Sequence, residues 1–234
     1  LSIKFPPYAA CPILATIDAN GAFAAPSFTM FNVSSNSSSL TLANLSFSQS
    51  NFTIIYAPQA MNTTIRLTNV IATDFANTFI RLQCAPGLSV FLQNCSFMHG
   101  LFNSSSQVIL ALHTLASQPS TKCETISVVD TLVLNMTDYG FLLYGVKNYF
   151  VRNSRFIDND NRRAARMFYV DSISILNTTM FQNDNGGISM YNCGHVLIED
   201  SIFEENARID RGGGSVYCES CHSLIARRST WSKN

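Results

Sequence analysis

Apolar and polar residues alternate in a short pattern that recurs along the chain. Each copy has two apolar residues spaced by two, then a polar residue, called the anchor below, two positions later. The eight copies occupy residues 40–44, 65–69, 90–94, 126–130, 149–153, 173–177, 196–200 and 224–228. The anchors are Asn44, Asn69, Asn94, Asp130, Asn153, Asn177, Asp200 and, as a departure from the pattern, Arg228. A period of two predicts a strand with one buried face before each anchor.

The spacing of the anchors predicts a solenoid. Successive anchors lie 25, 25, 36, 23, 24, 23 and 28 residues apart, which is too long for one strand and suits one coil of several short strands. Stacking such coils at about 4.8 Å buries the inner faces and gives a rod about 40 Å long. Helical repeats of similar length are the alternative, but β-branched and aromatic residues dominate the periodic positions.

We therefore predict an all-β fold, a right-handed parallel β-helix of about eight coils. Residues 40–234 form the β-helix, and residues 1–39 form an N-terminal cap or extension. The long interval of 36 residues predicts an insertion loop within residues 101–122.

Aligning the coils on their anchors produces two further columns. Three positions after the anchors stand large apolar residues, predicted to fill one corner of the core: Phe47, Phe97, Phe156, Phe203 and Trp231, with Ala72, Val133 and Met180 between them. Six positions after the last four anchors stand Asn159, Asn183, Asn206 and Asn234. We expect these amides to form a ladder of hydrogen bonds that also satisfies the backbone of the turns.

Two phrases in the later coils resemble a known family. Residues 156–159, 203–206 and 231–234 read F-I-D-N, F-E-E-N and W-S-K-N, and residues 186–188 and 212–216 read G-G-I and G-G-G-S-V. They resemble the F-x-x-N and G-G-A-[IV] phrases of the polymorphic membrane proteins, which are secreted β-helical adhesins. The resemblance is clearest from about residue 150 onward, and it implies an adhesive or structural β-helical passenger.

Composition argues against several classes of partner. The chain has 234 residues, 47% hydrophobic, with 15 basic and 15 acidic residues, so no broad positive field attracts nucleic acid. No apolar run approaches the roughly 20 residues of a membrane-spanning helix. An excess of Asn-x-Ser/Thr triplets favours the secretory pathway and an extracellular or cell-surface location.

The acceptor triplets divide into two sets. Continued alternation points the anchors Asn44, Asn94 and Asn177 into the solenoid, where an amide cannot carry a sugar. We expect glycosylation instead on the triplets that have no such conflict: Asn32, Asn36, Asn51, Asn62, Asn103 and Asn135.

Seven cysteines suggest disulfides in an oxidising compartment. Cys193 and Cys221 fall at the same offset in neighbouring coils, which predicts a disulfide between rungs, and Cys84 with Cys123 is the second expected pair. Residues 218–222 read C-E-S-C-H, which also fits covalent haem attachment or, with Cys193 and His195, a zinc site. Disulfide formation is the favoured use, and no cofactor or metal is predicted.

Acidic residues gather after the later anchors, at Asp158, Asp160, Asp184, Glu204, Glu205 and Asp210. Paired carboxylates serve as acid and base in β-helix lyases and glycosidases. Neighbouring arginines at 162, 163, 166, 208 and 211 would neutralise these acids, so solvated loop charge is the favoured interpretation and no catalytic residue is predicted. Tyr144, Tyr149, Phe150, Tyr169 and Tyr191 would suit a sugar-stacking face, although strand aromatics are more often core.

These patterns predict a non-catalytic extracellular glycoprotein, a structural or adhesive β-helix of a surface coat, appendage or fibre. The expected partners are further copies or neighbouring surface proteins, joined through the ends of the solenoid, and glycans. A β-helix polysaccharide lyase or glycosidase and a carbohydrate-binding module are the alternatives.

Overall fold

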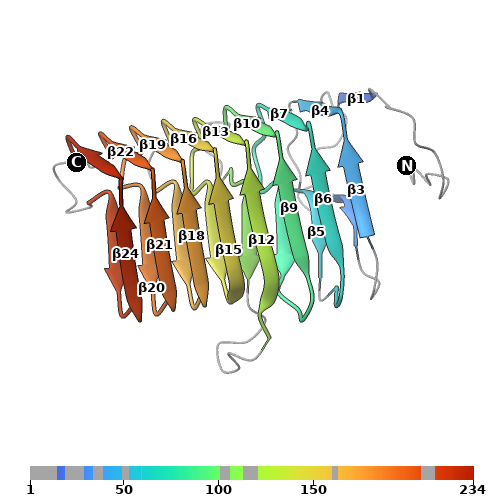
Figure 1. The fold of residues 1–234 in the computed structure, drawn as a ribbon. Helices are drawn as coiled ribbons and strands as arrows, with labels where there is room; N and C mark the ends of the chain where they lie inside the picture. The colour runs from blue at the N-terminus through green and yellow to red at the C-terminus, as the bar shows by residue number, and fades with distance from the viewer. Residues whose placement is uncertain are drawn as a thin grey trace.

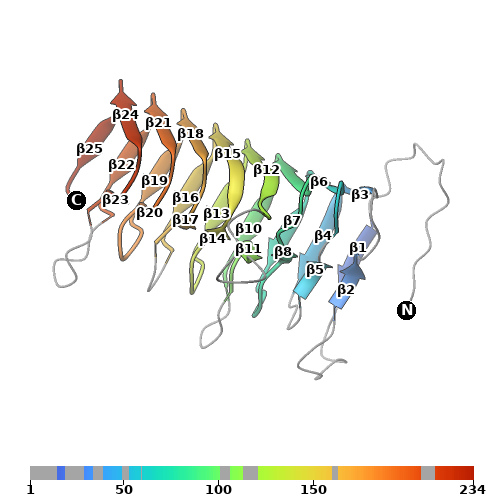
Figure 2. The same ribbon diagram turned by 90° about the horizontal axis from the view of Figure 1, so that it is seen from below.

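The computed structural model shows a stack of parallel coils that forms an elongated solenoid (Figure 1). It describes residues 15–18, 29–33, 39–48, 53–58, 60–100, 106–112, 121–159, 163–206 and 214–234. Every strand pairing is parallel, and the strands form three sheets. Figure 2 shows the sheets from below, with each coil contributing one strand to each sheet. None of the described segments forms a helix long and apolar enough to cross a membrane.

Each described coil passes from sheet B through sheet C to sheet A. Sheet B contains β2 (Thr29–Asn32), β5 (Thr53–Ala57), β8 (Ile80–Gln83), β11 (Ile109–Leu112), β14 (Phe141–Tyr144), β17 (Ala165–Phe168), β20 (Ile188–Tyr191) and β23 (Val216–Glu219). Sheet C contains β3 (Ser39–Ala43), β6 (Thr64–Thr68), β9 (Ser89–Gln93), β12 (Cys123–Val129), β15 (Val146–Arg152), β18 (Ser172–Leu176), β21 (His195–Glu199) and β24 (Ser223–Arg227). Sheet A contains β1 (Ala15–Asp18), β4 (Leu45–Ser48), β7 (Ile71–Thr73), β10 (Ser96–Met98), β13 (Leu132–Leu134), β16 (Arg155–Ile157), β19 (Thr179–Phe181), β22 (Ile202–Glu204) and β25 (Thr230–Ser232).

The register confirms that the predicted repeats are equivalent. The alternating pairs before the anchors lie in sheet C, where Leu40 pairs with Ile65, Ile65 with Val90, and so on to Leu224. Each anchor therefore stands between a strand of sheet C and the following strand of sheet A.

The direction of the anchor side chains was predicted wrongly. Every anchor from Asn44 to Arg228 has a positive φ, between 45° and 56°. One left-handed residue turns the chain and interrupts the two-residue alternation, so the anchor faces outward and the residue after it faces the core. Asn94 and Asn177 are exposed and Asn44 is half-buried, while Leu45 is buried. Asn and Asp are the non-glycine residues best tolerated in this conformation, which explains their recurrence.

The anchors form a ladder on the outside of the solenoid. The amide of Asn69 donates to the side-chain oxygen of Asn44 at 2.8 Å, and that of Asn94 donates to Asn69 at 2.7 Å. The amide of Asn153 donates to Asp130 at 3.0 Å, and that of Asn177 donates to Asn153 at 2.9 Å. At the last two anchors an ion pair continues the contacts, because Arg228 lies 2.7 Å from Asp200.

The apolar column predicted three positions after the anchors lies in sheet A and points into the core. Phe47, Phe97, Phe156 and Phe203 are buried, and the strand register places Ala72, Val133 and Met180 between them. Phe79, at the start of sheet B, packs edge-to-face on Phe97 at a centroid distance of 5.1 Å. Trp231 stacks on Phe203 in the last rung at 5.5 Å but is 41% exposed.

The predicted inner Asn ladder is present. Asn159, Asn183 and Asn206 are fully buried, and the amide nitrogen of each of the first two donates to the next side-chain oxygen, at 2.6 and 2.7 Å. The same oxygens accept backbone N–H groups of the preceding rung, as Asn206 does from Asn183 at 3.2 Å. Asn234 continues the column by accepting from the backbone of Asn206 at 2.9 Å.

Buried hydroxyls form a further ladder directly after the anchors. The backbone N–H of Thr131 donates to the Ser154 hydroxyl at 3.2 Å, and that of Thr178 donates to the Ser201 hydroxyl at 3.2 Å. Each hydroxyl also donates to the carbonyl two residues before it, as Ser201 does to Glu199 at 2.8 Å. The free thiol of Cys95 occupies the same column and donates to the carbonyl of Gln93 at 3.3 Å. The core is therefore ordered by polar columns as well as apolar ones.

The predicted N-terminal extension and the predicted insertion loop both contain strands of the solenoid. β1 and β2 pair with β4 and β5, so sheets A and B already include residues of the predicted N-terminal extension. β11 lies within the predicted insertion and pairs with β8 and β14. The extra residues of this coil therefore fall in two connections, between Met98 and Ile109 and between Leu112 and Cys123.

Candidate functional site

The two predicted disulfides have different outcomes. Cys84 and Cys123 are joined, as predicted, with a Cα separation of 4.6 Å, and both are buried. The Cys193–Cys221 pair was predicted wrongly, because Cys221 is joined to Cys218 at a Cα separation of 6.0 Å and Cys193 is a buried free thiol. Cys218 occupies an inward position of β23 only three residues before Cys221, so it competes with Cys193 for the same partner.

The C-E-S-C-H phrase is consequently occupied by its own disulfide, so neither thiol is available for a thioether or a zinc ligand. Within the described chain, no group of three metal-ligating side chains is close enough to hold an ion. His195 contacts the Ser223 hydroxyl at 2.9 Å, and its ring lies edge-to-face with that of His222 at 4.8 Å.

Two of the described acidic residues of the later coils, Glu204 and Glu205, contact basic or amide groups of neighbouring rungs. Glu205 accepts from Lys233 at 2.8 Å and from the Gln182 amide at 2.9 Å, and the Lys233 hydrogen bond holds the pKa of the Glu205 carboxyl below its ordinary value. Glu204 lies 3.6 Å from the same lysine. Asp158 is an exposed left-handed turn residue. Asp160 and Asp210 lie outside the described residues.

Aromatic side chains form a row on the outer face of sheet B. Tyr144 of β14, Phe168 of β17 and Tyr191 of β20 are register partners, and all three lie at half-buried outward positions. The rings of Tyr144 and Phe168 stack at 4.2 Å with 5° between their planes, and those of Phe168 and Tyr191 stack at 4.8 Å with 12°. Tyr217 of β23 lies in the neighbouring outward column, opposite Ser189, and its tilted ring is 5.5 Å from that of Tyr191.

Two arginines lie against this row. Arg166 points outward from β17; its guanidinium carbon is 4.9 Å from the Phe168 ring centroid and 5.3 Å from that of Tyr191. Its Nη1 donates to the Tyr139 hydroxyl at 2.7 Å. Arg163, just before β17, lies 5.5 Å from the Tyr217 ring. We call Tyr144, Arg163, Arg166, Phe168, Tyr191 and Tyr217 the arginine–aromatic face.

The electrostatics of this face are unbalanced. Neither Arg163 nor Arg166 has an acidic partner among the described residues, and Nη1 of Arg163 and Nε of Arg166 are buried without a hydrogen bond. Burial lowers the pKa of Arg163, and neighbouring Arg166 lowers it further, while nearby tyrosines oppose the change. Glu219 is the acidic residue at the outward strand positions described in sheet B, and its carboxylate accepts from the Tyr217 hydroxyl at 2.8 Å. The face therefore carries positive charge that no carboxylate of the described residues neutralises.

The arrangement sets limits on what the face can bind. Because the rings of Tyr144, Phe168 and Tyr191 stack on one another, their faces are already covered and a sugar ring meets mainly their edges and hydroxyls. Guanidinium and phenol groups suit a ligand with many hydroxyl or carboxylate acceptors.

Sequence reasoning identified only part of this face. It named Tyr144 and Tyr191 as sugar-stacking candidates, but Tyr149 is a fully buried core residue and Phe150 belongs to sheet C. Tyr169 is an exposed turn residue with a positive φ. It missed Phe168, Tyr217 and the role of the two arginines, which it treated only as neutralising charge. The available signal was the spacing of 24 and 23 residues from Tyr144 to Phe168 and from Phe168 to Tyr191, which equals one coil.

Comparison with known proteins agrees with the observed architecture. The family model described as the right-handed beta helix region matches residues 114–234, slightly more than half of the chain. No curated protein matches the sequence. The three-sheet parallel coil, the stacked columns and the family match agree, and the chain belongs to the right-handed β-helix family.

Proposed function

We propose that the protein is a non-catalytic, extracellular β-helix glycoprotein with an adhesive role in a surface coat, appendage or fibre, and that it attaches to glycans through the arginine–aromatic face. The observation that carries the proposal is the pair of guanidinium groups, Arg163 and Arg166, that lie against aromatic rings without an acidic partner in the described chain. The resemblance of the later coils to β-helical adhesins supports the adhesive role.

The chemistry of the face favours a polymeric, acceptor-rich ligand. Arg163 and Arg166 are half-buried, so part of each side chain is open to solvent, and guanidinium N–H groups donate strong charge-assisted hydrogen bonds to carboxylate or hydroxyl oxygens. The row of Tyr144, Phe168 and Tyr191 runs along the stacking direction of the coils, so a linear glycan lying along sheet B meets an aromatic ring at three successive rungs.

Secretion is supported by cysteine chemistry and acceptor triplets. The two disulfides are typical of an oxidising compartment. Of the acceptor residues expected to carry glycans, Asn32 and Asn62 are exposed and Asn135 is half-buried. Asn36, Asn51 and Asn103 lie outside the described residues. Association through the ends of the solenoid stays a prediction.

A polysaccharide lyase or glycosidase is the competing function, since β-helices support both. A glycosidase pair needs two carboxylates about 5–9.5 Å apart beside the bound sugar. Glu219 is the described strand carboxylate of this face, and it hydrogen-bonds Tyr217. Activity therefore has to be measured together with binding.

A glycan array screened with the full chain tests the proposal, followed by titration of the best ligand. Arg166→Ala is expected to weaken binding about 10–100-fold, as the loss of one or two charge-assisted hydrogen bonds predicts. Arg152→Ala is the matched control, because Arg152 is an exposed arginine on sheet C, 5.9 Å from the Phe150 ring. It is expected to bind as tightly as the wild type.

Two results would contradict the proposal. Equal binding by the wild type and Arg166→Ala, or no glycan bound at all, removes the assigned role of the face. Shortening of the bound glycan, detected as new reducing ends or as ultraviolet absorbance of unsaturated products, would show that the protein is an enzyme.

A further inference from the structure

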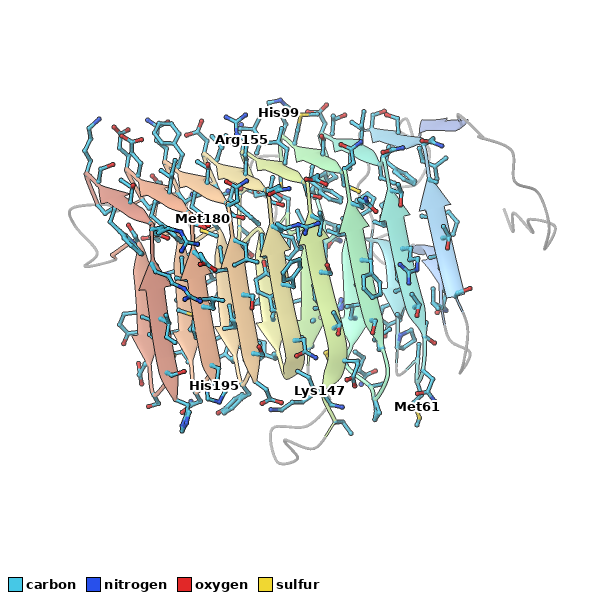
Figure 3. The ribbon with its side chains drawn as sticks, in the orientation of Figure 1. Met61, His99, Lys147, Arg155, Met180 and His195 are labelled. Atoms are coloured by element: carbon cyan, nitrogen blue, oxygen red, sulfur yellow. A yellow bond between two sulfur atoms is a disulfide. The ribbon has the colours of Figure 1, made fainter. Side chains whose placement is uncertain are left out.

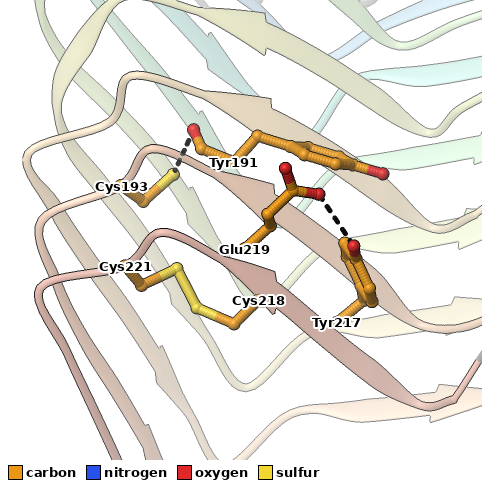
Figure 4. Close-up of a disulfide and its surroundings, with 6 residues drawn as sticks. All are labelled: Tyr191, Cys193, Tyr217, Cys218, Glu219 and Cys221. Atoms are coloured by element: carbon orange, nitrogen blue, oxygen red, sulfur yellow. Dashed lines mark hydrogen bonds between the residues drawn. A yellow bond between two sulfur atoms is a disulfide. The ribbon is translucent and has the colours of Figure 1, made fainter.

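Three cysteines gather at the C-terminal end of the described solenoid (Figure 4). Cys218 lies in β23, Cys221 in the turn between β23 and β24, and Cys193 in the corresponding turn one rung earlier. The backbone N–H of His222 donates to the carbonyl of Cys193 at 2.9 Å, so Cys221 lies beside Cys193 on the next rung. A free thiol therefore neighbours a disulfide.

The two disulfides among the described residues have unlike surroundings. Cys84–Cys123 is buried and joins residues 39 apart in sequence, so it restricts a long loop of the unfolded chain. Cys218–Cys221 joins residues only three apart, and both cysteines are partly exposed. Because the entropic stabilisation by a disulfide grows with loop length, the second bond contributes less to holding the fold together. Its accessibility also leaves it open to exchange.

The geometry permits a second pairing of Cys221. Residues in equivalent positions of adjacent parallel rungs have Cα atoms about 5 Å apart, and disulfides span about 4.4–6.8 Å. The strand register puts His195 opposite Ser223, which places Cys193 opposite Cys221. Cys193 is 4% exposed, and its thiol donates to the carbonyl of Tyr191 at 3.5 Å, as Figure 4 shows.

We propose that Cys193, Cys218 and Cys221 form an intramolecular thiol–disulfide exchange site, in which Cys221 alternates between Cys218 and Cys193. Cys193 loses its proton to solvent, and its thiolate attacks Sγ of Cys221. The Cys193–Cys221 bond forms, the Cys218–Cys221 bond breaks, and Cys218 leaves as a thiolate that takes a proton from water. The step needs no external oxidant or reductant, because one disulfide replaces another.

The exchange changes both the fold and the surface. A Cys193–Cys221 bond links two successive rungs across 28 residues, whereas Cys218–Cys221 closes one turn within a rung. It also releases a thiol at Cys218, a half-buried position of β23 whose side chain points inward. In the described state, burial raises the pKa of Cys193, which keeps this thiol protonated at neutral pH and makes the exchange slow.

Trapping the released thiol tests the proposal. The folded full chain is incubated at mildly alkaline pH with N-ethylmaleimide, quenched with acid and digested without reduction. Cleavage at Arg211, Glu219 and Glu199 by trypsin and a glutamate-specific protease places the three cysteines in three separate peptides. The expected result is a growing amount of the Cys193–Cys221 peptide pair with maleimide on Cys218.

Internal controls are available in the same molecule. Loss of the Cys218–Cys221 bond is expected to be at least tenfold faster than loss of Cys84–Cys123. Cys193→Ser is expected to abolish the conversion. Cys218→Ser, folded in a buffer in which oxidised glutathione supplies the oxidant, is expected to contain a Cys193–Cys221 disulfide. A Cys218–Cys221 bond that persists in the wild type, with Cys193 alkylated or still a thiol, overturns the proposal, as does a folded Cys218→Ser protein with two free thiols at 193 and 221.

Discussion

The inner Asn ladder makes a quantitative prediction about Asn183→Ala. The Asn183 amide donates to the carbonyl of Phe156 at 3.1 Å and to the side-chain oxygen of Asn206 at 2.7 Å. Its oxygen accepts from the side-chain amide of Asn159 at 2.6 Å and from the backbone of Asn159 at 3.3 Å. All three asparagines are 0% exposed, so no bulk water replaces these bonds.

The expected destabilisation follows from the groups left without a partner. Removing the amide orphans the backbone N–H of Asn159 and one of its side-chain N–H groups, and it takes one donor from the carbonyl of Phe156. Asn206 keeps an acceptor role, because the backbone of residue 183 still donates to it at 3.2 Å. For two buried unsatisfied groups at about 1–3 kcal/mol each, Asn183→Ala lowers the free energy of unfolding by about 2–6 kcal/mol.

The outer ladder supplies the matched control. Asn177 donates to Asn153 at 2.9 Å in the same rung-to-rung manner, but both side chains are exposed and water can replace the bond. Asn177→Gly keeps the positive φ of 45° without strain, so we expect a loss within about 1 kcal/mol.

Urea unfolding followed by circular dichroism measures the two losses. Hydrogen exchange at the amide of Asn159 locates the first, since solenoids unfold in part by neighbouring repeats. Equal losses for Asn183→Ala and Asn177→Gly would refute the argument from burial.

Other substitutions test the core, a close backbone approach, a buried thiol and a glycan site. Figure 3 labels Met61 and His195, the sequence neighbours of Asn62 and Gly194. Phe97→Ala, at a 0% exposed position, should cost about 3–5 kcal/mol of stability in urea. Gly194→Ala would place Cβ 2.1 Å from the carbonyl oxygen of Asp171, so a loss of about 1–3 kcal/mol in melting experiments is expected. Burial raises the pKa of the Cys95 thiol above its unfolded value of about 8.5. The stabilisation from the protonated thiol is therefore complete below the unfolded pKa and is lost as pH rises through the folded pKa. Cys95→Ser should remove this loss of stability at alkaline pH, measured in unfolding curves. Site-resolved mass spectrometry of native protein should find a glycan on exposed Asn62, and an unmodified Asn62 would contradict the assignment.

The solenoid could be predicted because its core residues recur once per coil and stack in columns. Alternation fixes which residues face inward within a strand, and alignment on the anchors fixes which residues stack. Phe156, Phe203 and Asn183 therefore lie in the columns that the sequence predicts.

The turns were harder to predict, because a single residue changes the phase. Asn177 continues an alternating strand in the sequence, yet its φ of 45° turns it outward. Both inward and outward anchors produce the same spacing, so only the backbone conformation decides. The partner of Cys221 was predicted wrongly for a related reason. Cys218, three residues earlier, and Cys193, on the neighbouring rung, both lie within the usual range of a disulfide.

The arginine–aromatic face was missed because outward positions carry little periodic signal. Its recognition required knowing that Phe168 and Tyr191 are register partners and that Arg166 shares their face. Without the strand register of sheet B, the sequence does not show that these aromatic and basic residues lie side by side.

The position of Arg166 suggests that its guanidinium serves something other than the fold. Its neighbours in the same outward column of sheet B are Leu142 and Ser189, and neither supplies an acceptor that requires an arginine. The strand itself would tolerate a leucine or serine at this position, as the adjacent rungs show. Nε of Arg166 is buried without a hydrogen-bond partner, which is unfavourable. The hydrogen bond from its Nη1 to the Tyr139 hydroxyl offsets part of this cost. A substitution at Arg166 that weakens glycan binding while leaving the urea midpoint nearly unchanged would therefore separate the function of this face from the stability of the solenoid beneath it.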